Sequence, residues 1–243
     1  MKKRWAQIMV INMSYFNSAE IVFEERHSEM NSFLIQFRLL KDSSTFDITR
    51  EHEHILKSNI VLMQYNILES AFLELFKCLY NFLKNCSLSV DSLNKSFTYN
   101  LYSIIKRSAT KKHQLIQDKL IREDSNLNFS NCAMLICFDL DAEEQKFLVN
   151  GNLDGKKIKK FLEDFGINIT SLNLLDLSQI QTLKDNRQLL AHGGSSFSEV
   201  GKQISWETLE ANSVTIKELF NQSKTLLTDF CNTLDQEMAR IAS

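Results

Sequence analysis

The chain contains no proline and only six glycines among its 243 residues. Proline interrupts a helix because it lacks an amide proton and its ring clashes with the preceding turn, while glycine weakens a helix through its backbone freedom. The same two residues supply most of the tight turns that a β-rich protein of this length needs. Their scarcity therefore predicts an all-α fold with long, uninterrupted helices.

The composition is that of an ordinary globular protein, with 44% hydrophobic and 24% charged residues, which is enough apolar material for a sizeable core. The formal net charge of -2 excludes an overall polycation, so any contact with nucleic acid must come from local basic patches. The basic, apolar start over residues 1–11 resembles a signal peptide, but polar residues interrupt it and no small-residue cleavage site follows. No apolar run approaches the ~18 residues of a membrane span, and we predict a cytoplasmic protein without membrane contact.

The five cysteines are odd in number and form no Cys-x-x-Cys pair, which favours reduced core thiols over disulfides or zinc ligands. They are Cys78, Cys86, Cys132, Cys137 and Cys231.

Apolar residues recur at helical spacing along most of the chain. The predicted helices cover residues 18–40, 49–85, a segment from Asp91 or Ser92 to about Ile105, 154–166, 178–192, and a last one from about Ser205. The centre of the second, residues 60–69, is apolar nearly all round, so we expect it in the middle of the bundle. Asp154 is the expected N-cap and Gly166 the expected C-cap of the fourth.

Residues 124–153 are the least helical part of the chain, and residues 133–138 within them have the composition of a short strand. We therefore predict one domain over residues 1–243: an N-terminal helical half at 1–123, a connecting excursion at 124–153 that is irregular or carries a short β-strand, and a second helical half at 154–243.

The helix predicted at 178–192 carries a charge on its apolar side. Ser178 is its expected cap, Gly193 and Gly194 end it, and at 100° per residue Arg187 falls between Leu183 and Leu190 on the apolar stripe. A buried, unpaired charge costs several kcal/mol. One interpretation is a buried ion pair or a side chain that reaches out to water. The other is a guanidinium that faces a cleft or a subunit interface, where its planar fork suits a phosphate.

His192 lies at the C-terminal end of the same helix, directly before two glycines. It either caps the last carbonyls of the helix or carries a proton, since histidine titrates near neutral pH.

The segment Asn186-Arg187-Gln188-Leu189-Leu190-Ala191-His192-Gly193 resembles the Arg-x4-His signature of HEPN domains. Three more segments, in the same order along the chain, resemble one bacterial HEPN-like nuclease subfamily. They are Leu62–Ser70, similar to Leu-Tyr-Asn-x-x-Glu-Ser; Val149–Asp154, similar to Gly-Asn-Leu-Asp; and Ser195–Lys202, similar to Ser-Phe-x-Glu-x-Gly-Arg. Together the matches span roughly residues 50 to 230.

The resemblance implies a HEPN-type helical bundle that forms a homodimer and brings two Arg-x4-His motifs face to face. It implies a metal-independent endoribonuclease without a cofactor, common among toxins and anti-phage effectors, with RNA as substrate and an antitoxin or defence protein as partner. Arg187 and His192 would be catalytic, and Asn186, Gln188 and Gly193 would support them. Gln188 stands where a small polar residue, often Asn, is usual, which favours the alternative: a non-catalytic HEPN module that dimerises or binds nucleotide as an adaptor.

Three other clusters rank lower. Lys106, Arg107, Lys111 and Lys112, with His113 beside them, are candidate contacts to the RNA backbone, although a solvated helix end is at least as good an interpretation. Lys156, Lys157, Lys159 and Lys160 at a helix start are expected to face water. His52 and His54, flanked by Glu51 and Glu53, alternate along a helix and so diverge, which favours exposed polar residues over a metal site.

Overall fold

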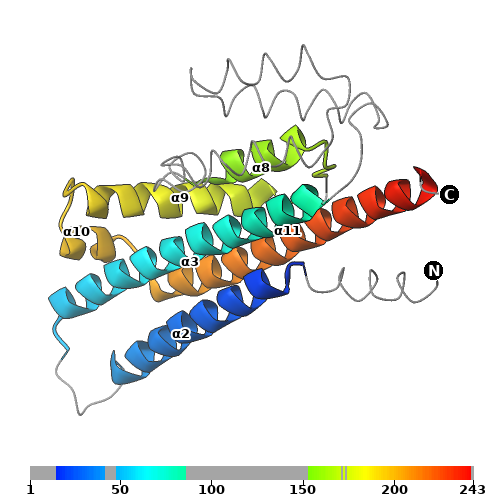
Figure 1. Cartoon of the computed structure of the whole chain (residues 1–243). Coiled ribbons are helices and arrows are strands. Elements are labelled where there is room, and N and C mark those ends of the chain that lie inside the picture. The colour runs from blue at the N-terminus through cyan, green and yellow to red at the C-terminus, as the bar shows by residue number, and fades with distance from the viewer. Residues whose placement is uncertain (1–14, 42–47, 86–152, 171, 173, 242–243) are drawn as a thin grey trace.

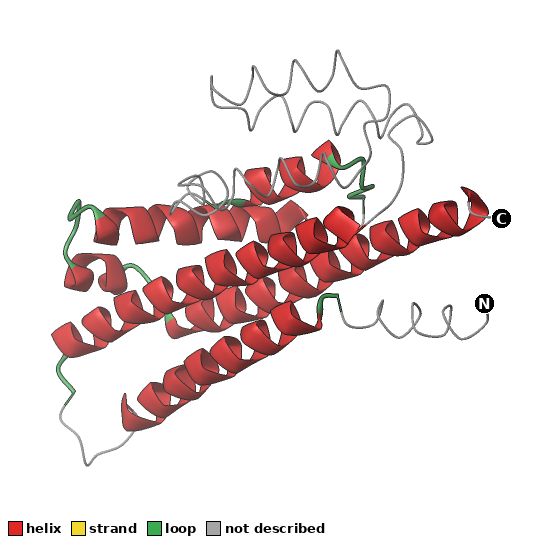
Figure 2. Cartoon of the chain, viewed as in Figure 1, coloured by secondary structure: helices red, strands yellow, loops and turns green. Residues whose placement is uncertain are grey.

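The computed structural model describes residues 15–41, 48–85, 153–170, 172 and 174–241. These residues form helices joined by turns and contain no strand (Figure 2), which confirms the all-α fold. The helices are α2 (Asn17–Lys41), α3 (Arg50–Asn85), α8 (Gly155–Asp164), α9 (Leu174–Ala191), α10 (Phe197–Lys202) and α11 (Trp206–Ile241).

Helix α3 is the centre of the bundle. It contacts α2 and α11 on one side, α9 on another, and α10 near its N-terminus, while α8 packs on α9 (Figure 1). Helices α2 and α9 run opposite to α3, and α11 runs parallel to it (Figure 1). Residues such as Ile60, Leu68 and Leu75 of α3 are fully buried. The prediction that the apolar segment 60–69 lies in the middle of the bundle is therefore confirmed.

Aromatic contacts join the layers of the core. The rings of Phe23 on α2 and Phe220 on α11 stack at 4.1 Å, and those of Phe76 on α3 and Phe161 on α8 lie 3.6 Å apart. Each fully buried phenylalanine contributes about 1.5–3 kcal/mol through removal from water. These contacts hold α11 to α2 and α8 to α3.

The short helix α10 was not predicted, although its signal stands in the sequence. The Ser196 hydroxyl accepts from the Glu199 amide at 3.2 Å, and the Glu199 carboxylate accepts from the Ser196 amide at 2.8 Å, so the two residues form a capping box. Hydrogen bonds to the carboxylate from the backbone amide of Ser196, and secondly from its side chain, hold the pKa of Glu199 below its usual value.

Several predicted boundaries agree with the structure and one is wrong. The helices 18–40, 49–85 and the one from Ser205 match α2, α3 and α11 within a residue or two. Asp154 caps α8 as predicted, and Gly166 ends that helix with φ 74°. Ser178 does not cap α9, because the helix already begins at Leu174 and nothing between these two residues breaks it.

The other predictions on the chain's middle lie outside the described residues: the helix from Asp91 or Ser92 to Ile105, and the excursion at 124–153 with its strand at 133–138. Cys78 and Cys231 are buried, as expected of core thiols, and burial raises the pKa of Cys78. The remaining cysteines also lie outside the described part. Among the described helices, none is both long and apolar enough to cross a membrane.

Candidate active site

The C-terminus of α9 is closed by glycines and not by a side chain. Gly193 adopts φ 66°, a left-handed conformation that glycine takes without strain. The Gly194 amide donates to the Leu189 carbonyl at 2.9 Å and the Gly193 amide to the Leu190 carbonyl at 3.4 Å. This is the Schellman arrangement, in which backbone amides satisfy the last carbonyls of a helix. Helix capping therefore does not require the imidazole of His192, which is exposed.

Arg187 lies on the apolar stripe of α9, as the sequence predicts. Its neighbours on that stripe, Ile180, Leu183 and Leu190, are at most 7% exposed, whereas Arg187 is half-buried. The guanidinium carbon lies 5.4 Å from the centre of the Tyr65 ring on α3, which is within the range of a cation–π contact. Within the described part of the chain, no carboxylate forms an ion pair with Arg187.

Tyr65 is itself held in place from two directions. Its ring is fully buried. Its hydroxyl oxygen lies 3.1 Å both from the carboxylate of Glu69 and from the carbonyl of Leu153, and the single hydroxyl proton is shared between these two acceptors. Burial and the negative charge of Glu69 raise the pKa of Tyr65, against smaller opposing effects that include the charge of Arg187. Tyr65 is therefore a neutral phenol at physiological pH.

Asp154, the N-cap of α8, links this helix to α9. The carboxylate of Asp154 accepts from the Lys184 ammonium at 2.7 Å and from the Lys157 amide at 2.8 Å. Burial acts to raise the pKa of Asp154, but the hydrogen bonds and charges of Lys184 and Lys157 outweigh it and hold that pKa below its usual value. The pair fixes α9 one turn before Arg187.

Arg187 and His192 leave α9 on different faces. Five residues along an α-helix correspond to a rotation of about 140°, and the structure agrees, because Arg187 lies against α3 while His192 is exposed. One copy of the chain thus presents a basic group beside α3 and an imidazole at the outside of the helix end. Leu189, three residues before His192, is also unusually exposed for its type, at 45%.

The remaining predicted site residues have different surroundings. Asn186 and Gln188 are half-buried and Gly193 is exposed at the turn. Gln188 makes a further contact of its own. The candidate RNA contacts Lys106, Arg107, Lys111 and Lys112 lie outside the described residues, as does His113.

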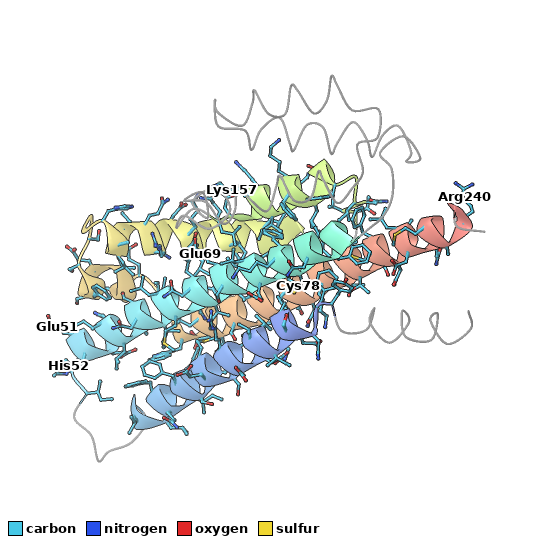
Figure 3. The ribbon with its side chains drawn as sticks, viewed as in Figure 1. Glu51, His52, Glu69, Cys78, Lys157 and Arg240 are labelled. Carbon is cyan, nitrogen blue, oxygen red and sulfur yellow. The ribbon has the colours of Figure 1, made fainter. Side chains whose placement is uncertain are left out.

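Most of the lysines of α8 face water as predicted, and His52 on α3 is exposed, whereas His54 is half-buried and so differs from the prediction. Lys156, Lys157 and Lys160 are exposed, and Lys159 pairs with Glu163 at 3.8 Å. Glu51 and His52 lie in the first turn of α3, at one end of the molecule, whereas Lys157 lies on α8 (Figure 3).

Glu53 is engaged elsewhere, because its carboxylate contacts the Lys57 ammonium and the Trp206 indole, both at 2.9 Å. The described residues include no group of three or more His, Cys, Asp or Glu side chains that could hold a metal ion.

Sequence reasoning missed the roles of Tyr65, Glu69 and Lys184 around Arg187. The first two belong to the Leu62–Ser70 segment that resembles a family motif, so a signal was present without an assigned role. Lys184 had no signal, because its partner Asp154 is 30 residues away in the sequence.

The four segments quoted above meet around α3 where the structure describes them. Tyr65, in the Leu62–Ser70 segment, donates a hydrogen bond to the carbonyl of Leu153, in the Gly-Asn-Leu-Asp segment. Asp154 of the latter segment binds Lys184 on α9, and Arg187 on α9 contacts the Tyr65 ring. The Ser195–Lys202 segment packs on α3, where the Ser58 hydroxyl donates to the Phe197 carbonyl at 2.6 Å.

Comparison with known proteins gives one match. The RiboL-PSP-HEPN family model matches residues 22–240. No curated protein and no solved structure matches the chain.

Proposed function

The chain belongs to the RiboL-PSP-HEPN family, and from this premise we propose that it is a metal-independent endoribonuclease with Arg187 and His192 at its active site. HEPN domains are often ribonucleases. The observation that carries the proposal is the pairing, on one helix, of an exposed histidine that capping does not require and an arginine that no described carboxylate neutralises. The first group can move a proton, and the second can bind a phosphate.

The reaction uses a nucleophile that RNA carries itself, the 2′-hydroxyl. A neutral imidazole takes the hydroxyl proton, the 2′-oxygen forms a bond to the adjacent phosphorus, and the bond from phosphorus to the 5′-oxygen breaks. An imidazolium supplies the proton that the leaving 5′-oxygen needs. The products are a 2′,3′-cyclic phosphate and a 5′-hydroxyl. Arginine stabilises the negative charge on the phosphoryl oxygens during this exchange.

We propose a homodimer as the active form. The chemistry above uses two imidazoles, whereas one motif supplies only His192, and Arg187 of the same copy faces away from it. HEPN domains commonly dimerise. The exposed Leu189 on the His192 side of α9 supports an interface there, because an apolar side chain gains stability when a partner removes it from water.

The biological setting is proposed from the sequence resemblance. We propose an effector of the toxin or anti-phage kind that acts on cytoplasmic RNA and is restrained by an antitoxin or a defence-system protein. Asn186, Gln188 and Gly193 are proposed to support the two principal residues, and the basic cluster at Lys106, Arg107, Lys111 and Lys112 to contact the RNA backbone.

The alternative function is a non-catalytic HEPN module that dimerises or binds nucleotide. A specific observation favours it: Arg187 rests against a fully buried tyrosine, a position in which it could serve packing alone. Gln188 after the arginine favours it as well.

Cleavage assays separate the two functions. The purified parent protein and His192→Ala are each incubated with total RNA and with tRNA. A substrate that the parent cleaves is then tested again in a 2′-O-methylated form of the same sequence. The nuclease cleaves unmodified RNA, and both the variant and the methylated substrate abolish cleavage. A parent protein that cleaves no RNA, or a His192→Ala variant that cleaves like the parent, supports the module instead.

A further inference from the structure

The phenol of Tyr65 lies beneath the guanidinium of Arg187, and we infer that Tyr65 is a positioning residue that sets the direction in which Arg187 presents its N–H donors to the substrate phosphate. The inference rests on the proposed nuclease function. It adds a residue on α3, 122 positions before Arg187, to a site so far confined to α9.

The ring of Tyr65 is rigid enough for this task. It is fully buried, Glu69 beside it is 9% exposed, and its hydroxyl is anchored to both Glu69 and the Leu153 carbonyl at 3.1 Å. A flexible arginine loses much of its rotamer freedom when it binds a phosphate. Stacking on a fixed ring restricts the side chain before the substrate arrives, and so lowers that cost at the moment of binding.

The type of residue under Arg187 matters as well. A carboxylate in this place would form an ion pair and occupy the donors that a phosphate needs. Tyr65 attracts the cation through its ring face instead, and no hydrogen bond to the guanidinium is found within the described residues. No described residue therefore occupies the N–H donors of Arg187 that a phosphate would need. The negative charge of Glu69 lies on the hydroxyl side of Tyr65, so it acts on Arg187 across the ring and not through a direct ion pair.

The test uses two substitutions at Tyr65 and one matched control. Tyr65→Phe keeps the ring and removes both hydrogen bonds, whereas Tyr65→Leu removes the ring. Phe72→Leu removes another buried ring from the same helix, seven residues on and in contact with Phe76. Single-turnover cleavage of RNA is measured well below the melting temperature of each variant, so that all variants are folded, and each substitution is also made in an Arg187→Ala background.

A residue that acts through Arg187 gives a non-additive pattern. We expect Tyr65→Leu to lower the cleavage rate about 10- to 100-fold, because a displacement of ~1 Å at a positioning group has an effect of this order, and Tyr65→Phe to lower it about 3- to 10-fold as its anchors are lost. In the Arg187→Ala background both factors fall to about one. Phe72→Leu leaves the rate unchanged. If the Tyr65 substitutions have the same effect with and without Arg187, or no effect in folded protein, the inference is wrong.

A measurement without RNA tests the contact between Tyr65 and Arg187 independently of the proposed nuclease function. The side-chain NεH resonance of Arg187, identified by its loss in Arg187→Lys, is expected to shift in Tyr65→Leu and to keep its place in Phe72→Leu. If the parent protein cleaves no RNA, the proposed function fails, and an unshifted resonance would in addition overturn the contact. If Tyr65→Leu does not fold, Tyr65→Phe carries both measurements.

Discussion

The guanidinium carbon of Arg187 on α9 lies 5.4 Å from the centre of the buried Tyr65 ring on α3. This contact explains how a charged side chain occupies the apolar stripe of a helix without an ion pair among the described residues. The ring face supplies a favourable electrostatic environment, and the half-exposed position leaves part of the guanidinium in water. The stripe therefore carries a charge that no carboxylate neutralises within the described part of the chain.

Stability and activity should respond differently to the loss of Arg187 and of His192. Arg187→Ala removes one cation–π contact, so we expect it to lower the free energy of unfolding by about 0.5–2 kcal/mol, well below the ~3–5 kcal/mol of a broken buried ion pair. Exposed His192→Ala should change it by no more than about 0.5 kcal/mol. Thermal or urea melts measure both values.

The same two variants should lose RNA cleavage, His192→Ala by about 10²- to 10⁴-fold through lost proton transfer and Arg187→Ala by about 10²- to 10³-fold through lost charge stabilisation. Two variants that are stable and as active as the parent would point to the interaction module. A large loss of stability in Arg187→Ala would assign the arginine to packing.

The proposed dimer makes Leu189 an interface residue. Leu189→Lys places a charge in the interface and should convert the dimer into a monomer, because a buried unpaired charge is costly. Leu39→Lys is the matched control, since Leu39 is also an exposed leucine, at 66%, but lies on α2. Light scattering should give twice the 28.2 kDa chain mass for the parent and the control. A parent that is monomeric at micromolar concentration would contradict the dimer.

The ion pair between Asp154 and Lys184 predicts a pH-dependent stability. Asn can still cap α8, so Asp154→Asn removes mainly the carboxylate charge, and we expect it to lower the free energy of unfolding at pH 7 by about 1.5–3 kcal/mol. The folded-state pKa of Asp154 lies below the ordinary value of 3.8. The contribution of the carboxylate is therefore complete above about pH 5 and is lost as the pH falls through 3.8 and then through the folded pKa.

Urea melts of the parent and Asp154→Asn from pH 7 down to the acid limit of folding measure this difference. It should narrow steadily below about pH 5. A difference that stays constant with pH would show that the charge of Asp154 is not the cause.

Gly201 allows α10 to lie directly on α3. A Cβ atom at this position would lie 1.8 Å from the carbonyl oxygen of His54, and because the obstacle is backbone, the two helices would have to separate. We expect Gly201→Ala to lower the free energy of unfolding by about 3 kcal/mol or more. Gly194→Ala is the control, since its added Cβ would come no closer than 3.4 Å, to the Leu189 side chain. Equal melting temperatures for the two variants would contradict this close approach.

Local signals in the sequence predict most of the helices and the unusual place of Arg187. The limits of α2, α3 and α11 follow from periodicity, and Asp154 and Gly166 follow from the chemistry of caps. Arg187 is recognisable because a charge on an apolar stripe is visible from spacing alone. One helix and one boundary were missed for local reasons: α10 is only six residues long, and Ser178 is a good N-cap residue that α9 accommodates in its first turns.

The partners of the site residues could not be predicted in the same way. Tyr65 and Arg187 are 122 residues apart, and Asp154 and Lys184 are 30 apart, so both contacts depend on how α3, α8 and α9 pack. Tyr65 also reads as an ordinary core residue on a helix that is apolar nearly all round. Its place in the Leu62–Ser70 segment marks it in the sequence, but its contact with Arg187 is visible only in the packed structure.

The central claim, metal-independent cleavage of RNA by His192 and Arg187, is tested most directly by incubating the purified chain with RNA in excess EDTA and identifying the new ends. Acid–base chemistry by histidine needs no metal. We predict that cleavage continues in EDTA, that the fragments carry a 2′,3′-cyclic phosphate and a 5′-hydroxyl, and that His192→Ala gives neither. Cleavage that stops in EDTA and returns with magnesium or manganese, or that leaves a 5′-phosphate, would contradict the mechanism.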